Sequence, residues 1–268
     1  ALPSQECGKP VCDAGSARLA ADSASAAPVT ALDVAQERLR AALRAGRVAR
    51  TARRNTFVLD ACCGTATSAT LFHLMTNRYA RVIGVDRDKA ESWVREHIPA
   101  RYRGRFVFVS EDIASLTPES IDEVMRVEWG AGLDRLSHFH DSHPCTTLSG
   151  ADRSGQHRYP DGAPKSDDAV RDDAVLESTV RLIESVLEVA PDCLVTIENP
   201  RGPWFAGLPV VKRLLADPRW HLMVGSYCKL AGPLDGARAW PRKHTYILAY
   251  NVPPLLELPV CRNDCTHL

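Results

Sequence analysis

Two short segments hold the residues best suited to covalent chemistry. Cys145 follows a proline in "HDSHPCTTLSG" (140–150), and Glu198 precedes an asparagine in "TIENP" (196–200). A thiolate is a strong nucleophile, and a carboxylic acid can donate a proton to a ring nitrogen as electrons move into the ring. Attack of Cys145 on carbon 6 of a cytosine, with Glu198 at nitrogen 3, would make carbon 5 nucleophilic enough to take a methyl group. The structural alternative is a buried thiol and a glutamate that caps a loop.

Three further carboxylates follow strand-like runs. Asp60 opens the small-residue turn in "LDACCGTATSA" (59–69), which lets backbone approach a ligand at a helix N-terminus. Asp86 in "GVDRD" (84–88) stands where an acid commonly accepts hydrogen bonds from ribose hydroxyls. Asp112 and Ile113 in "VSEDI" (109–113) could hold a purine by one polar and one apolar contact. A nucleoside-bearing cofactor fits, although the turn lacks a Walker lysine and a full G-x-G-x-x-G.

The elements that must position these residues alternate along the chain. Short β-rich runs are separated by helical patterns, which predicts parallel crossovers and a doubly wound α/β sheet. Two late runs with no helical pattern between them predict an antiparallel hairpin. The seven predicted strands are 56–60, 81–86, 105–110, 136–142, 193–199, 221–228 and 244–250. The sheet is therefore expected to be seven-stranded, mostly parallel, and to end in that hairpin.

The ordered pairs Pro144–Cys145 and Glu198–Asn199 resemble the Pro-Cys and Glu-Asn motifs of cytosine carbon-5 DNA methyltransferases, in particular short phage- and virus-type members. The resemblance covers about residues 56–250. It implies a Rossmann-like class I fold that uses S-adenosylmethionine, with Cys145 as nucleophile and Glu198 as proton donor. Arg242 in "PRKHTYIL" (241–248) is the counterpart of an arginine that helps hold the base. The implied cofactor-binding residues are Asp60, Cys62, Cys63, Gly64, Thr65, Asp86, Arg87, Asp112, Ile113 and Pro144.

The chain departs from that family in three places. Ala66 replaces the second glycine of the cofactor loop, and Thr146 replaces the usual glutamine after the nucleophile. The segment after residue 250 has no room for a target-recognition domain. We therefore expect single-stranded or distorted duplex DNA to be favoured, or a protein partner to supply target recognition. Two alternatives stay open: a methyltransferase for RNA or a free pyrimidine nucleotide, and a catalytically silent nucleic-acid-binding or regulatory protein.

A second group of soft ligands lies near the C-terminus. "CRNDCTH" (261–267) holds Cys261, Cys265 and His267, which suggests zinc, and the alternative is a frayed, reduced tail. Cys228 is a candidate fourth ligand, as is one of Cys7 and Cys12. Three further histidines resemble metal ligands, but such residues more often line a core or a pocket. They are His138, His140 and His143.

Composition limits the function classes. Thirty-three basic and 33 acidic residues give no net charge, so the overall charge does not indicate a nucleic-acid partner. Seven arginines between Arg38 and Arg54 could nevertheless lie along phosphates. The nine cysteines are an odd number, which suits reduced thiols better than a disulfide framework and favours a reducing, intracellular compartment. No apolar run is long enough for a membrane helix. We expect a flexible segment at 1–30, a catalytic domain at 31–255 that begins with a helix over 32–43, and a Cys/His tail at 256–268.

Overall fold

A computed structural model describes residues 55–64, 69–89, 91–149, 155–226, 244–252 and 258–262. Seven strands form one sheet in the order β3-β2-β1-β4-β5-β7-β6, which confirms the predicted number of strands. Their ends differ from the predicted ones by two residues at most. The strands are β1 Thr56–Ala61, β2 Ala80–Val85, β3 Phe106–Val109, β4 Leu136–Asp141, β5 Leu194–Pro200, β6 Trp220–Ser226 and β7 His244–Tyr250.

The direction of the strands decides where a ligand can bind. Strands β1 to β5 are parallel to one another, while β7 is antiparallel to both of its neighbours, β5 and β6. The hairpin prediction is thus confirmed, and β7 inserts between β5 and β6. The sheet is the predicted Rossmann-like α/β sheet, mostly parallel and ending in an antiparallel hairpin. Because β1 to β5 share a direction, their carboxyl ends meet at one edge of the sheet, where open α/β sheets bind ligands.

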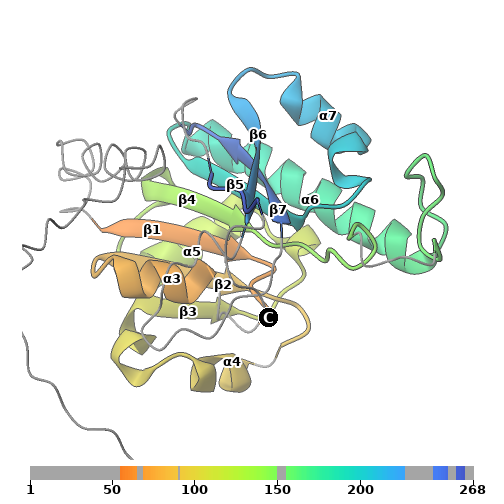
Figure 1. The fold of residues 1–268 in the computed structure, drawn as a ribbon. Helices are drawn as coiled ribbons and strands as arrows, with labels where there is room; N and C mark the ends of the chain where they lie inside the picture. Colours follow the sequence, from red (N-terminus) through yellow and green to blue (C-terminus); the bar gives the residue numbers. More distant parts are fainter. Residues whose placement is uncertain are drawn as a thin grey trace, which may run out of the picture.

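Helices cover both faces of the sheet (Figure 1). The strand order runs outward from β1 to β3 and then returns to β4 and β5, so right-handed crossovers place the first two helices on one face and the next two on the other. Two separate apolar clusters match these two layers. The helices are α3 Ala69–Thr76, α4 Glu91–His97, α5 Pro118–Trp129, α6 Asp167–Val189 and α7 Pro209–Leu215.

The longest helix, α6, has a local reason to begin where it does. The Ser166 side chain accepts a hydrogen bond from the backbone N–H of Ala169, and two aspartates occupy the first turn. These groups satisfy an amide that the helix cannot pair internally and favour the positive end of its dipole. The start of α6 therefore lies at a fixed place beside the carboxyl ends of β4 and β5.

Part of the predicted C-terminal tail packs against the sheet. The carbonyl of Pro259 accepts a hydrogen bond from the N–H of Ser226 at 3.0 Å, and the N–H of Cys261 donates to the Ser226 hydroxyl at 2.8 Å. Cys261 is buried. Residues 258–262 therefore lie against β6, whereas 256, 257 and 263–268 of the predicted tail lie outside the described residues.

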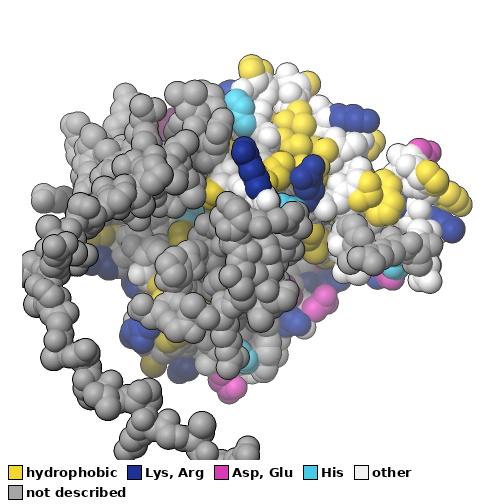
Figure 2. Space-filling view, viewed as in Figure 1, with side chains coloured by type: hydrophobic (Ala, Val, Ile, Leu, Met, Phe, Trp, Pro, Cys, Tyr) yellow, Lys and Arg dark blue, Asp and Glu magenta, His cyan; other side chains and the backbone are white. Residues whose placement is uncertain are grey.

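Several predictions fall outside the described residues. They are the flexible segment 1–30, the helix over 32–43 and the arginine-rich segment 38–54. Within the described ranges, the helices are too short or too polar to cross a membrane. On the face of Figure 2, the described surface mixes hydrophobic and basic side chains, with no broad patch of a single charge.

Candidate functional site

A cavity of about 200 Å³ opens at the carboxyl ends of β2 and β3 and beside the segment that follows β4. Six of the residues predicted to bind cofactor line it: Cys62, Asp86, Arg87, Asp112, Ile113 and Pro144. Val85, Asp88, Glu111, Ser142 and Val175 complete the lining. Residues from five distant parts of the chain therefore share one concave site, which combines carboxylates with aliphatic side chains.

Asp86 ties the loop after β1 to the end of β2. Its Oδ2 accepts a hydrogen bond from the N–H of Gly64 and its Oδ1 one from the N–H of Asp88, both at 2.9 Å. Gly64 and Cys62 have φ angles of 56° and 53°, so the turn makes two left-handed steps. Glycine adopts such an angle without strain, whereas Cys62 does so at a cost of order 1 kcal/mol or more. Asp86 thus holds a strained turn against the cavity, and each of its oxygens keeps a second lone pair for a ligand.

Arg87 and Asp112 form an ion pair across the mouth of the cavity. Arg87 Nη1 lies 2.9 Å from Asp112 Oδ2, and the two side chains are 48% and 38% exposed. The other oxygen, Asp112 Oδ1, accepts from the N–H of Ala114 at 2.9 Å and caps the turn that begins at Ile113. These hydrogen bonds, first that of Ala114 and then that of Arg87, lower the pKa of Asp112. The carboxylate is held ionised and in place.

Other predicted cofactor residues point away from this cavity. Asp60 is buried, accepts a hydrogen bond from the Thr70 hydroxyl, and has a pKa raised by burial, against the opposing effects of His140 and Thr70. Cys63 packs in the apolar cluster under α3 and α4. Gly64 contributes its N–H to Asp86 rather than a surface of the cavity, and Thr65 lies outside the described residues.

The two thiols of the cavity region have different characters. Burial raises the pKa of the Cys62 thiol, and the carboxylates of Asp141 and Asp86 raise it further. Cys62 therefore remains a neutral thiol on the cavity wall, which makes it a poor nucleophile. Cys145 is half-buried one residue beyond Pro144, and its carbonyl accepts hydrogen bonds from the N–H groups of Leu148 and Ser149.

Cys145 and Glu198 extend from neighbouring strands. β4 and β5 pair in parallel up to Asp141 and Ile197, so Glu198 is the next residue of β5 and Cys145 follows β4 by four positions. Glu198 is half-buried, and its carboxylate accepts a hydrogen bond from the Thr245 hydroxyl on β7. The strand pairing brings the two predicted catalytic segments to one edge. Arg242, the third predicted catalytic residue, lies outside the described residues.

A chain of partly buried polar contacts joins α3, β4 and β5 near this edge. The rings of His73 and His138 have nitrogens 3.1 Å apart, and the Thr196 hydroxyl lies 2.7 Å from His138 Nε2 and 2.8 Å from His140 Nδ1. His140 Nε2 in turn lies 2.9 Å from the Ser142 hydroxyl. Burial lowers the pKa of His73 to about 4, with a smaller contribution from His140, and burial also lowers that of His138. The contacts of these side chains link α3, β4 and β5, and the lowered pKa values keep His73 and His138 neutral.

Two positioning groups could not be foreseen from the sequence. Buried His143 lies between Asp141, at 2.9 Å from Nδ1, and Asn199, at 3.1 Å from Nε2. Arg158, also fully buried, donates to the carbonyl of Thr147 and forms an ion pair with Asp173 on α6. The repeated histidines of 138–143 indicated that these side chains have polar roles, but the sequence did not reveal a partner as remote as Asn199. A lone arginine in a loop gave no signal.

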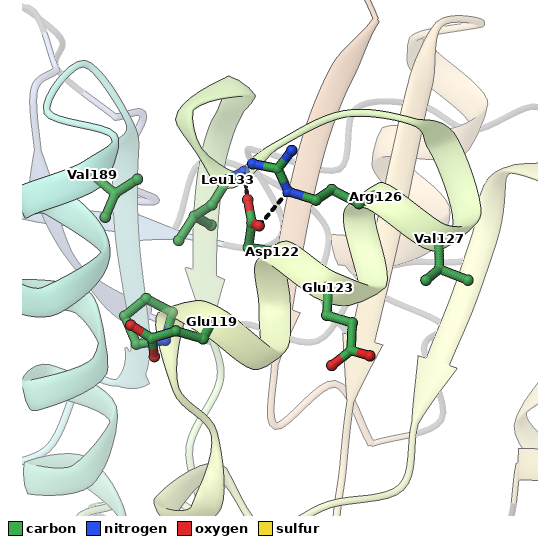
Figure 3. A pocket seen from close by; sticks show the side chains of 8 residues that line it. Glu119, Asp122, Glu123, Arg126, Val127, Leu133 and Val189 are labelled. Atoms are coloured by element: carbon green, nitrogen blue, oxygen red, sulfur yellow. Dashed lines mark hydrogen bonds and ion pairs between the residues drawn. The ribbon is translucent and has the colours of Figure 1, made fainter.

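A larger cavity, of about 470 Å³, lies elsewhere (Figure 3). It is lined mainly by α5, with Leu133 before β4 and Val189 at the end of α6. Its one ion pair joins Arg126 to Asp122, which also accepts from the N–H of Leu133. This cavity lies toward the amino ends of the strands, and neither cysteine nor histidine lines it.

The described residues hold no group of three or more His, Cys, Asp or Glu side chains arranged to bind a metal ion. That includes His138, His140 and His143, which bind hydroxyl, carboxylate and amide groups instead. Of the predicted zinc ligands, Cys261 is described, whereas Cys228, Cys265, His267, Cys7 and Cys12 lie outside the described ranges. Zinc at the C-terminus stays a prediction.

Comparison with known proteins gave structural neighbours only. No family model matches the chain, and no curated protein matches it. The 16S rRNA (adenine(1408)-N(1))-methyltransferase from Catenulisporales acidiphilia is 16% identical over 77% of this chain and 92% of its own, with a TM-score of 0.41. Human methyltransferase 10 domain containing protein is 11% identical over 74% and 72%, with a TM-score of 0.41. A SAM-dependent methyltransferase from Aquifex aeolicus is 11% identical over 76% and 87%, with a TM-score of 0.37.

Proposed function

We propose that this chain transfers a methyl group from S-adenosylmethionine to carbon 5 of a cytosine, through a covalent adduct of Cys145. The observation that carries the proposal is the meeting of two strand ends at one edge. β4 leads into Pro144–Cys145, neighbouring β5 carries Glu198, and Pro144 lines the same cavity as Asp86 and Asp112. A nucleophile, an acid and a concave site with ribose acceptors are what this reaction needs.

The described residues fit the nucleoside part of the cofactor. Asp86 offers carboxylate oxygens that ribose hydroxyls can reach, and Val85, Ile113 and Val175 offer aliphatic walls for an adenine ring. The cavity is smaller than the roughly 300–1,000 Å³ of a full ligand site, so these walls enclose part of the cofactor. Residues 65–68, which follow Gly64, lie outside the described residues.

The proposed chemistry balances with these groups. Cys145 Sγ adds to carbon 6 while Glu198 donates a proton or hydrogen bond at nitrogen 3, and carbon 5 forms the new bond to the methyl group. S-adenosylmethionine supplies that methyl group and leaves as S-adenosylhomocysteine. Water then accepts the carbon-5 proton, Glu198 takes back any proton that it gave to nitrogen 3, and cleavage of the Sγ–carbon 6 bond restores the aromatic ring and the thiolate.

The substrate is proposed to be DNA in which the cytosine is already unpaired or easily extruded. Cys145 can reach carbon 6 only if the base leaves its stack, and extrusion costs a few kcal/mol, least for a single-stranded or mismatched base. The arginines of 38–54 and the loop 149–166 are the segments proposed to meet phosphates, and such contacts weaken steeply with salt.

One panel tests the proposal and its alternatives. Methyl transfer from labelled S-adenosylmethionine is measured on duplex DNA, mismatched duplex, single-stranded DNA, RNA and deoxycytidine nucleotides. We expect 5-methylcytosine in single-stranded or mismatched DNA above the level in perfect duplex. Product only in RNA or only in nucleotides would replace DNA as the substrate, and no product with any acceptor, despite bound cofactor, would favour a silent binding protein.

A further inference from the structure

His143 stands between the two strand ends on which the proposed reaction depends. Its side chain is fully buried and bridges Asp141 at the end of β4 to Asn199 on β5. The ladder between these strands pairs residues only as far as Asp141 and Ile197. The contact of His143 with Asn199 therefore joins the two strands beyond the point where their backbone pairing stops.

The hydrogen-bond roles of the His143 ring follow from its partners. The Asn199 amide nitrogen is a donor only, so Nε2 accepts and the ring proton sits on Nδ1, where it is donated to Asp141. The ring also stacks on Phe205, with centroids 5.9 Å apart, and Phe205 stacks on Tyr246 of β7. Both ring nitrogens and one ring face are thus engaged by separate elements.

The buried partners of His143 depend on it. Asp141 and Asn199 have no exposed surface, and neither Asp141 Oδ1 nor Asn199 Oδ1 has a hydrogen-bond partner among the described residues. Removal of the ring would leave a buried carboxylate and a buried amide with still fewer partners, which is costly. Such groups relax by moving, and the backbone that would move carries Pro144–Cys145 on one side and Glu198 on the other.

We propose that His143 is a positioning residue, which fixes the Cys145 segment relative to Glu198 through its two hydrogen bonds. The expected effect of His143 on catalysis rests on the proposed function. Its effect on the position of Cys145 does not. His143 does not touch the base or the cofactor in this arrangement, since its ring nitrogens are both occupied. Asn199 acts together with His143. In the Glu-Asn segment, Glu198 is then the proposed acid, and Asn199 links β5 to the segment that follows β4.

The experiment uses a matched pair of variants in the full chain. His143→Phe keeps a ring that can stack on Phe205 but loses both hydrogen bonds, whereas His143→Gln keeps one donor and one acceptor without the aromatic ring. Asn199→Asp removes the donor to Nε2 while conserving shape, and serves if His143→Phe does not fold. Phe57→Leu, at the amino end of β1, controls for loss of core stability far from this edge.

Two rates are measured for each variant. The first is alkylation of Cys145 by iodoacetamide, followed on its tryptic peptide, with buried Cys193 as an internal reference for global unfolding. The second is covalent trapping by a single-stranded oligonucleotide that contains 5-fluoro-2′-deoxycytidine, in the presence of S-adenosylmethionine. Calorimetry gives the affinity for the cofactor.

We expect His143→Phe and Asn199→Asp to alkylate Cys145 several-fold faster while Cys193 stays protected, and to trap the oligonucleotide ~10-fold more slowly, as a small misplacement of a reacting group commonly causes. Cofactor affinity should stay within about twofold, and His143→Gln should restore both rates to within about threefold of the original chain, because it can replace both bonds. Equal rates in His143→Phe and the original chain, or equal losses in His143→Phe and His143→Gln, would overturn the proposal. If the original chain itself traps no oligonucleotide, the proposed function fails, and the alkylation rates alone decide whether His143 holds Cys145.

Discussion

The two halves of the carboxyl edge are built in different ways. At β2 and β3, half-buried carboxylates are held by backbone amides, as Asp86 is by Gly64 and Asp88, and Asp112 by Ala114. At β4 and β5, buried side chains hold one another across strands, as His143 does with Asn199. The first half can therefore adapt to a ligand at modest cost, whereas the second fixes the groups that we propose to react before any ligand arrives. A change in the second half should accordingly cost more.

The largest effect is expected at Cys145. Cys145→Ser should lower methyl transfer by at least ~10³-fold, because a hydroxyl is a far weaker nucleophile than a thiolate, while cofactor affinity stays within about twofold. Methyl transfer is measured with labelled S-adenosylmethionine and affinity by calorimetry. Cys193→Ala, at a buried thiol before β5, is the matched control and should keep its activity. Residual turnover in Cys145→Ser near that of the original chain would remove the covalent step.

The next effect is expected at Glu198. Glu198→Gln should slow transfer by on the order of a hundredfold, the range for loss of a positioned acid. The control is Glu184→Gln, which neutralises an exposed glutamate on α6 that pairs with Arg213. Single-turnover rates compare the two variants. A rate for Glu198→Gln equal to that of Glu184→Gln would make Glu198 a structural partner of Thr245.

The difference between the two halves also sets what the sequence can predict. Strand positions follow from short β-rich runs, and the acids Asp86 and Asp112 are visible because they come one and three residues after their strands. The sequence also placed Cys145 at the end of the fourth predicted strand and Glu198 at the end of the fifth, and these two strands are neighbours in the sheet. It could not predict that Asp60 turns away to Thr70, or that Arg158 reaches Thr147 and Asp173, because these contacts depend on which side chains the fold buries together.

A smaller effect is expected at Asp86, in the adaptable half. Asp86→Ala should weaken S-adenosylmethionine binding by roughly 1–3 kcal/mol, since ribose acceptors and the support of the Gly64 turn are both lost. Calorimetry at one ionic strength measures this. Asp88→Ala removes a negative charge from the same cavity but keeps the hydrogen-bond acceptor for Gly64. The pair of variants therefore separates the electrostatic effect of the charge from the effect of the direct contacts. Equal affinities in the two variants would show that the assignment of Asp86 is wrong.

The buried histidines predict a pH dependence of stability. The pKa of His73 is about 4 in the folded chain against an ordinary value of 6.5, so the unfolded chain binds more protons between these values. The contribution of His73 to the free energy of unfolding is fully present above pH 6.5. It is lost as the pH falls toward 4, and the free energy of unfolding is lower by on the order of 1 kcal/mol at about pH 5. Urea unfolding of the original chain and of His73→Gln at a series of pH values gives the slope. A slope that His73→Gln leaves unchanged would assign the effect to other groups.

The smallest effect is expected at the exposed ion pair of Arg87 and Asp112. A double-mutant cycle of Arg87→Ala and Asp112→Asn should give a coupling free energy of about 0.2–1 kcal/mol in urea unfolding, because the pair is open to solvent and screened by salt. The cycle is repeated at high salt, where the coupling should shrink. Coupling above about 2 kcal/mol would mean that this half is as rigid as the other.

The central claim is that Cys145 forms a covalent bond to carbon 6 of the target base. Its most direct test is mass spectrometry of the chain after reaction with an oligonucleotide that contains 5-fluoro-2′-deoxycytidine and with S-adenosylmethionine. The account predicts one stable adduct that carries the transferred methyl group and maps to the tryptic peptide of Cys145. Formation of 5-methylcytosine in ordinary substrate with no such adduct, or an adduct on another cysteine, would contradict it.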